Sequence, residues 1–183
     1  MQKIFTIENF LSEEECFDLI TNIKKEYTLT QATVAGTTNS EGISDVRKSS
    51  ITFLPNIESI DEKLKSTLRD NIKLNGFEAT KLNPYQFTEY KVGEYYEWHT
   101  DSSETIYTER FCSIVIQLND SYEGGELEIT DKDIIKIKKK TGTLCVFYSS
   151  MLHRVTSVTS GTRYSLVNWV CLDKLKNYKK TLI

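Results

Sequence analysis

Hydrophobic and polar positions divide the chain into an N-terminal part with two predicted helices and a longer part built from short strands. Before residue 85, apolar residues recur every three or four positions in two stretches, the spacing that gathers them on one side of a helix. From residue 85 onwards they form short runs separated by turn residues such as Lys91-Val92-Gly93, which is typical of strands. The pattern therefore predicts a mainly β protein with helices in its N-terminal half.

The first predicted helix begins at Ser12, after a short strand at residues 3–7. Ser12 and Glu15 are three residues apart, which is typical of a capping box, where a hydroxyl and a carboxylate bind free amide groups at a helix start. The apolar residues that follow at helical spacing are Cys16, Leu19, Ile20, Ile23 and Tyr27. We interpret this segment as a helix that packs on a core.

The second predicted helix begins near Ser59, with Glu62 completing another capping box, and Asn75-Gly76 supplies its stop signal. Its apolar stripe consists of Ile60, Leu64, Leu68 and Ile72. We expect both helices to pack against one side of a sheet.

Residues 28–50 are polar and contain few large apolar side chains, and residues 35–42 have the composition of a loop. Residues 45–53 then return to a strand pattern. A loop this long in a compact domain is commonly a lid or binding loop, or else a disordered segment, and the composition favours neither. We treat residues 31–50 as a candidate lid, with Arg47 and Lys48 as candidate substrate contacts.

Eight strands are expected in the second part of the chain. They cover residues 85–90, 95–99, 111–118, 126–129, 134–137, 143–148, 153–155 and 163–171. Turn signals such as Glu123-Gly124-Gly125 separate them. Many short strands at this spacing favour a β-sandwich or a barrel.

Composition narrows the classes of partner and of compartment. The chain has 183 residues, the length of one domain, and its net charge of -3 gives no electrostatic reason to expect nucleic acid as a partner. No apolar run approaches the ~20 residues that span a bilayer, and no secretory signal pattern opens the sequence. The four cysteines form no CxxC pair, so we expect them to be reduced and the protein to be cytoplasmic.

The chain has only two histidines, and both lie among the predicted strands. His99 and Asp101 are two positions apart, so on a strand they project to the same side. His153 follows a second hydrophobic run, after a gap long enough for strands to leave and return. Either histidine alone is more often a core or surface residue. Together, two imidazoles and a carboxylate match the facial triad of non-haem Fe(II) oxygenases, and we predict a metal site from them.

Arg163 follows His153 on a strand, and one face of that strand would carry Arg163, Ser165, Val167 and Trp169. An arginine among apolar neighbours needs an anion, and its guanidinium group binds a carboxylate with two parallel hydrogen bonds. Pairing with a carboxylate of the protein itself, or exposure to solvent, is the alternative interpretation.

Four segments carry a resemblance to a known family: residues 90–101, 122–127, 148–155 and 161–169. They resemble the 2-oxoglutarate- and Fe(II)-dependent dioxygenases, and within them the prolyl 4-hydroxylase-like group with its bacterial PKHD-type hydroxylases. The resemblance covers about half of the chain and extends more loosely to the helix after Asn9-Phe10-Leu11-Ser12. Animal and plant prolyl hydroxylases usually carry lysine at the position of Arg163, so this sequence resembles the bacterial group more closely.

The resemblance implies a fold, a metal and a co-substrate. The fold is a double-stranded β-helix, or jelly roll, with N-terminal helices packed on one sheet. The implied Fe(II) ligands are His99, Asp101 and His153. The residues implied to bind 2-oxoglutarate are Arg163, Tyr90 and Ser165. The same family implies O2 as a reactant, with ascorbate as a candidate reductant.

By the same resemblance, Tyr96, Arg110 and Trp169 fall where the family contacts or orients its substrate. Tyr96 and Trp169 also suit a position in the core. We expect a single dioxygenase domain over residues 1–183, with residues 1–82 as helical support and lid region and residues 83–172 as the catalytic jelly roll.

The main functional hypothesis is hydroxylation of a C–H bond with release of succinate and CO2, with a prolyl residue of a peptide or protein as one candidate target. The partner would be a peptide, a protein or a small molecule, and the sequence sets no oligomeric state. One alternative is a non-enzymatic jelly-roll binding module with a vestigial or structural metal site. A further alternative is a cupin-like metal enzyme without a co-substrate, although cupins normally supply more histidines.

Overall fold

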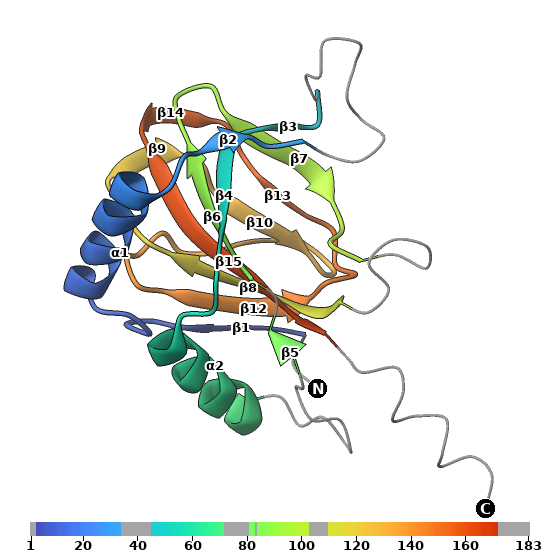
Figure 1. Cartoon of the computed structure of the whole chain (residues 1–183). Helices are drawn as coiled ribbons and strands as arrows, with labels where there is room; N and C mark the ends of the chain where they lie inside the picture. Colours follow the sequence, from blue (N-terminus) through green and yellow to red (C-terminus); the bar gives the residue numbers. More distant parts are fainter. Residues whose placement is uncertain (1–2, 34–44, 72–80, 83, 103–109, 172–183) are drawn as a thin grey trace, which may run out of the picture.

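The computed structural model describes residues 3–33, 45–71, 81–82, 84–102 and 110–171. These residues form two helices and three antiparallel sheets (Figure 1). The mainly β fold with flanking helices, expected from the sequence, is confirmed.

The large sheet has eight strands. In spatial order they are β1 (Ile4–Ile7), β12 (Leu144–Tyr148), β8 (Arg110–Gln117), β15 (Arg163–Cys171), β6 (Tyr85–Tyr90), β4 (Ser50–Leu54) and β2 (Thr30–Gln31), and β5 (Lys81–Leu82) pairs with the end of β15. Long apolar runs in β8 and β12 suit these positions, because both faces of their part of the sheet are covered by other elements.

A smaller sheet of five strands faces the large one, as Figure 1 shows. Its order is β11 (Ile134–Lys136), β10 (Leu127–Thr130), β13 (His153–Val155), β7 (Tyr95–His99) and β3 (Arg47–Lys48). A third sheet pairs β14 (Val158–Gly161) with β9 (Tyr122–Gly124).

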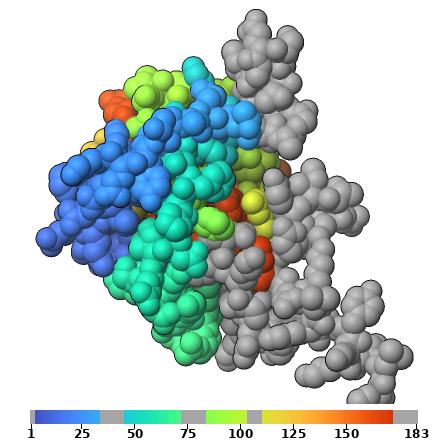
Figure 2. Space-filling model, in the orientation of Figure 1, coloured from blue at the N-terminus to red at the C-terminus, as the bar shows by residue number. Residues whose placement is uncertain are grey.

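The two helices, α1 (Glu13–Glu26) and α2 (Glu58–Asn71), cover the outer face of the large sheet. Figure 2 shows their blue and blue-green side chains covering this side of the molecule. The apolar stripes predicted for the two helices join one core cluster with strand residues such as Phe87, Ile114 and Leu166. A second cluster, which includes Phe147 and Ile129, fills part of the space between the sheets.

The capping box of the first helix is confirmed. The Ser12 hydroxyl accepts from the Glu15 amide at 3.0 Å, and the Glu15 carboxylate accepts from the Ser12 amide at 2.7 Å. The second capping box was wrong, because α2 begins at Glu58 and Ser59 lies inside its first turn. The carbonyl of Ile57 accepts the Asp61 amide instead, and Glu62 pairs with Lys65 at 2.8 Å. Ile72 and the predicted stop at Asn75-Gly76 lie outside the described residues.

The single strand predicted over residues 45–53 was also wrong. Its first part, β3, pairs with β7 in the small sheet, and its second part, β4, pairs with β6 in the large sheet. The chain crosses between the sheets at Ser49, which is fully buried and accepts the Ala32 amide at 2.8 Å. Residues 34–44 of the candidate lid lie outside the described residues.

Four short strands were missed by the sequence pattern, namely β2, β5, β9 and β14. The segment interpreted as a turn around Glu123-Gly124-Gly125 contains β9, which pairs with β14 across an irregular register. Both strands are short and β9 ends in glycine, so neither carries a periodic apolar signal.

All four cysteines are buried, and none of them is in a disulfide. Among the described residues, no helix has the length and apolar character needed to cross a membrane.

The packing of α2 on the large sheet can be tested with Leu64→Ala. Leu64 is fully buried in the helix–sheet core, so we expect the substitution to lower the free energy of unfolding by about 2–5 kcal/mol. The same change at Leu152, which is 43% exposed, is the matched control and should cost about 1 kcal/mol or less. Urea denaturation followed by circular dichroism measures both, and equal losses would contradict this packing.

Candidate metal and co-substrate site

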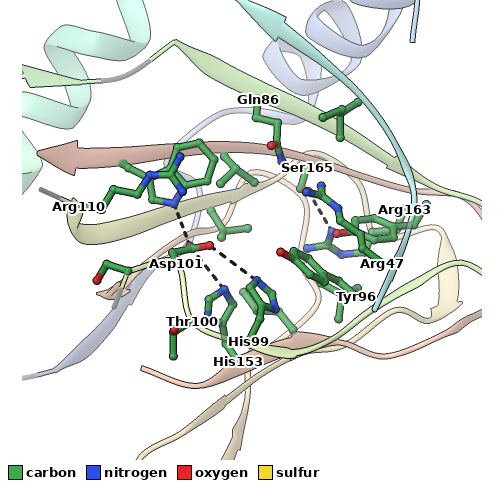
Figure 3. A pocket seen from close by; sticks show the side chains of 18 of the residues that line it. Arg47, Gln86, Tyr96, His99, Thr100, Asp101, Arg110, His153, Arg163 and Ser165 are labelled. Carbon is green, nitrogen blue, oxygen red and sulfur yellow. Dashed lines mark hydrogen bonds and ion pairs between the residues drawn. The ribbon is translucent and has the colours of Figure 1, made fainter. Parts of the chain in front are cut away.

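The three predicted metal ligands converge between the sheets. His153 on β13 is the direct cross-strand partner of His99 on β7, and their ring centroids are 4.1 Å apart. Asp101 lies just after the end of β7. One potential ligand atom from each of the three residues lies within 4.8 Å of the others (Figure 3).

Backbone carbonyls fix the direction of both imidazoles. The Nδ1 atom of His99 lies 2.7 Å from the Glu97 carbonyl, and that of His153 lies 2.9 Å from the Met151 carbonyl. Because a carbonyl only accepts, each Nδ1 must carry the proton, which assigns the tautomer and leaves Nε2 with a lone pair. The Nε2 atoms lie 3.7 and 3.6 Å from the two Asp101 carboxylate oxygens. Such an arrangement suits metal binding, where the second ring nitrogen is commonly held by a carbonyl.

The protonation states also suit a metal. Burial, together with the nearby His153, lowers the pKa of His99 to about 3. Burial opposes ionisation of Asp101, but His153, His99 and the hydrogen bonds from Ser113 and Trp169 outweigh it and hold its pKa below the usual value. A neutral imidazole and an ionised carboxylate are the forms that bind a divalent cation.

A cavity of about 520 Å³ opens beside the triad. It is lined by all three candidate ligands and by every residue predicted to bind the co-substrate. Four predicted substrate contacts also line it: Tyr96, Arg110, Trp169 and Arg47. Lys48, the other candidate contact on the lid, is exposed and lies outside this lining. Gln86, Ile51 and Phe53, which the sequence did not suggest, also line the cavity.

Arg163 is buried in the same cavity, with 2% of its surface exposed. Its Nη1 donates to the Ser165 hydroxyl at 3.0 Å, and its guanidinium group lies 5.3 Å from the ring centre of Tyr90, its cross-strand partner. Its Nε has no hydrogen-bond partner, and no carboxylate of the described residues forms an ion pair with it. A buried cation without an anion is costly, so the alternative of pairing with a protein carboxylate finds no support among the described residues.

Aromatic rings line the cavity next to the other two arginines. Tyr96 stacks on the imidazole of His99 with 3.4 Å between ring centres, and the Arg47 guanidinium lies 4.6 Å from the Tyr96 ring. Arg110 lies 3.8 Å from the ring of Trp169 on the opposite side of the triad (Figure 3). Tyr96 and Trp169 therefore serve both as packing residues and as cavity wall.

Two functional candidates were missed. Ser113 donates to the Asp101 carboxylate at 2.6 Å, and Ser149 lies 3.0 Å from Ser113. Ser113 could have been noticed because it interrupts an apolar strand, residues 111–118, where a hydroxyl needs a partner. Ser149 lies in a segment that carried the family resemblance, but its sequence position alone gives no partner.

Residues 85–171 match the family model described as the 2OG-Fe(II) oxygenase superfamily. Over these residues the chain is similar to members of this superfamily. The matched range contains the triad, Arg163 and all strands from β6 to β15. The family match therefore covers both the buried arginine and the His-Asp-His cluster, which share one cavity.

Similar sequences include PKHD-type hydroxylases. One from Acinetobacter baumannii is 33% identical over 99 residues, which is 49% of this chain and 44% of that protein. Another, from Crocosphaera subtropica, is 26% identical over 174 residues, covering 91% of this chain and 78% of that protein. For the Acinetobacter protein and the other curated relatives with the strongest local match, the chain spans less than half of the relative's length.

Solved structures of prolyl hydroxylases share the fold of this chain. A prolyl-4-hydroxylase from Pseudomonas putida has a TM-score of 0.71 and 21% identity, covering 93% of both chains. A prolyl hydroxylase from Trichoplax adhaerens, solved with a hypoxia inducible factor peptide, has a TM-score of 0.74 and 19% identity, covering 92% of this chain and 83% of that one.

The low pKa of His99 predicts that the metal-free protein is sensitive to acid. The unfolded chain takes up a proton near pH 6.5 and the folded chain only near pH 3, so stability is complete above the first value and is lost as the pH falls towards the second. We expect about 2 kcal/mol less stability at pH 5 than at pH 7 from this residue.

Denaturation of the chelator-treated protein at both pH values measures this loss. His99→Asn, which cannot take up the proton, should lose correspondingly less stability over the same interval. Equal acid sensitivity of the two proteins would mean that His99 is not held neutral by burial.

Proposed function

We propose that the protein is an Fe(II)- and 2-oxoglutarate-dependent dioxygenase that hydroxylates a C–H bond and releases succinate and CO2. The observation that carries the proposal is the buried Arg163, which lies in the same cavity as the His-Asp-His cluster and has no carboxylate partner among the described residues. A dicarboxylate that chelates a metal with one end and meets a guanidinium with the other fits both features.

His99, Asp101 and His153 would hold the Fe(II). Two neutral imidazoles and one carboxylate form the donor set of the facial triad, which leaves the opposite positions of the metal open. The bound metal, with O2 and 2-oxoglutarate, would supply the oxidation chemistry. The contribution of the chain is to fix the ligands and to keep the reacting groups away from bulk water.

Arg163 would bind the distal carboxylate of 2-oxoglutarate, with Ser165 and Tyr90 beside it. The Ser165 hydroxyl already accepts a hydrogen bond from one guanidinium nitrogen and holds the group in place. The Tyr90 ring covers it from the neighbouring strand. A guanidinium held in this way loses little freedom on binding its anion.

The substrate would lie in the remaining part of the cavity, against Tyr96, Trp169, Arg110 and Arg47. We propose a peptide, a protein or a small molecule as substrate, with a prolyl residue as the first candidate. The shared fold with the two prolyl hydroxylases supports this candidate. Ascorbate as reductant and a cytoplasmic location belong to the same proposal, and four cysteines without a disulfide are compatible with that compartment.

A non-enzymatic binding module is less well supported. Such a module has no use for a buried guanidinium in the same cavity as a His-Asp-His cluster, because an uncompensated cation only destabilises the fold. Arg163 therefore favours the enzyme over the binding module.

Turnover is the first test. We expect the purified protein with Fe(II), 2-oxoglutarate and O2 to release succinate, with faster release when a screen of prolyl peptides and free amino acids includes a substrate. A chelator should abolish release, and added Fe(II) should restore it. His153→Ala should reduce turnover by about 100-fold or more, because a two-ligand site holds the metal poorly. Absence of succinate in every mixture, together with unchanged metal binding in His153→Ala, would refute the assignment.

The role of Arg163 is tested by Arg163→Lys. We expect affinity for 2-oxoglutarate, measured by calorimetry with Mn(II) under nitrogen, to fall by about 2 kcal/mol, because an ammonium cannot form the two parallel bonds. The matched control is Arg154→Lys, since Arg154 binds Glu128 at 2.8 Å and lies outside the cavity lining. Equal affinities of both variants and the parent would exclude Arg163 as the anchor.

A further inference from the structure

Buried polar side chains that are not candidate ligands hold the Asp101 carboxylate. The Ser113 hydroxyl donates to its Oδ2 atom at 2.6 Å, and the Trp169 indole donates to the same atom at 2.9 Å. Among the described residues, none donates a hydrogen bond to Oδ1. The two oxygens of one carboxylate therefore have different surroundings.

Ser149 supports this arrangement from behind. Its hydroxyl lies 3.0 Å from that of Ser113, and both serines are fully buried. Because Ser113 gives its single proton to Asp101, Ser149 must be the donor between the two hydroxyls. The chain of donation thus runs from Ser149 through Ser113 to Oδ2, and each bond polarises the next.

The backbone around Asp101 is held at the same place. The Ser149 carbonyl accepts the amides of Asp101 at 2.8 Å and Ser102 at 3.1 Å. The Ser149 amide in turn donates to the Phe111 carbonyl on β8 at 3.0 Å. Asp101, which follows the end of β7, is therefore held by main-chain and side-chain bonds that converge on one turn.

The donors and the histidines come from opposite sheets. Ser113 lies on β8 and Trp169 on β15 of the large sheet, whereas His99 and His153 lie on β7 and β13 of the small sheet. The Asp101 carboxylate accepts from the Trp169 indole and also lies beside the two imidazoles, which Figure 3 shows next to it. This carboxylate is thus the point where the two halves of the site meet.

Distance alone does not decide which oxygen would bind a cation. Oδ1 lies 3.7 Å from the Nε2 of His99, and Oδ2 lies 3.6 Å from the Nε2 of His153. Hydrogen bonding does decide it, because two donors already use the lone pairs of Oδ2. If Oδ2 turned to the metal, the buried donors of Ser113 and Trp169 would lose their acceptor, at a cost of about 1–3 kcal/mol each.

We propose that Ser113, Ser149 and Trp169 are positioning residues that hold Oδ2 and present Oδ1 alone to a divalent cation. Asp101 then acts as a ligand through one oxygen and leaves room on the metal for a chelating co-substrate. The proposal rests on the proposed metal-dependent function. It also assigns Trp169 a second task besides forming the cavity wall beside Arg110.

Titration with Co(II), in the absence of 2-oxoglutarate, tests the proposal without any need for turnover. Calorimetry gives the affinity, and the visible absorption of the Co(II)-saturated protein reports the ligand geometry. We expect Ser113→Ala and Trp169→Phe to bind Co(II) about 10- to 100-fold more weakly, the usual effect of removing a partner of a metal ligand. Both saturated variants should show an altered Co(II) spectrum.

Trp98→Phe is the matched control, since it makes the same change at the other tryptophan of the chain. Trp98 lies against Arg154 at 4.7 Å and outside the cavity lining. We expect its Co(II) affinity to stay within about twofold of the parent and its spectrum to be unchanged. Ser113→Ala removes little more than an oxygen atom, so it carries the test even where Trp169→Phe folds poorly.

The outcomes separate this proposal from the function on which it rests. A parent protein that binds no Co(II) would refute the metal site itself. A parent that binds Co(II), with Ser113→Ala and Trp169→Phe equal to it in affinity and spectrum, would overturn the positioning role and leave the metal site standing. A third outcome is weaker binding with an unchanged spectrum, together with an equally lowered melting temperature of the metal-free variants. It would assign these residues to general stability and would also overturn the positioning role.

Discussion

The pairing of β13 with β7 is the constraint on which the site depends. It places His153 directly opposite His99, and these are the only histidines of the chain. In an antiparallel pair, opposite residues project to the same face, so one register determines whether the two imidazoles meet. A slip by one residue would turn one of them to the other side of the sheet and separate the ligands.

The alternation of side chains along β15 gives that strand two roles. Leu166 and Val170 face the helices and belong to the core that supports the large sheet. Arg163, Ser165 and Trp169 face the small sheet and line the cavity. Packing of the helices on one face therefore fixes the position of the polar residues on the other. The burial of Arg163 is stable only within such a rigid setting, because a loosely held cation would move into water.

Local signals predicted much of this architecture. The boundaries of β6, β7, β13 and β15 follow from short apolar runs between turn residues, and the start of α1 follows from the Ser12 capping box. The sequence also predicted the candidate ligands and Arg163, which line one cavity. The chain has only two histidines, so their positions on predicted strands were informative. The division of the polypeptide into residues 1–82 and 83–172 stays a prediction.

The failures have a common physical origin, which is dependence on contacts that are distant in sequence. Ser113 gains its role from Asp101 and Ser149, which reach it only after the sheets have formed. The short strands β9 and β14 exist because each supplies the other's hydrogen bonds. Ser59 has the spacing of a capping box, but α2 begins one position earlier, at Glu58. The Ile57 carbonyl accepts the first hydrogen bond of the helix.

The crossing at Ser49 has a geometric consequence for the width of the cavity. β3 and β4 belong to opposite walls of the cavity, and a single residue separates them. Because consecutive Cα atoms are about 3.8 Å apart, this residue limits how far the walls can separate at that edge. The spacing of the two sheets along this edge is thus tied to the length of a covalent link of one residue.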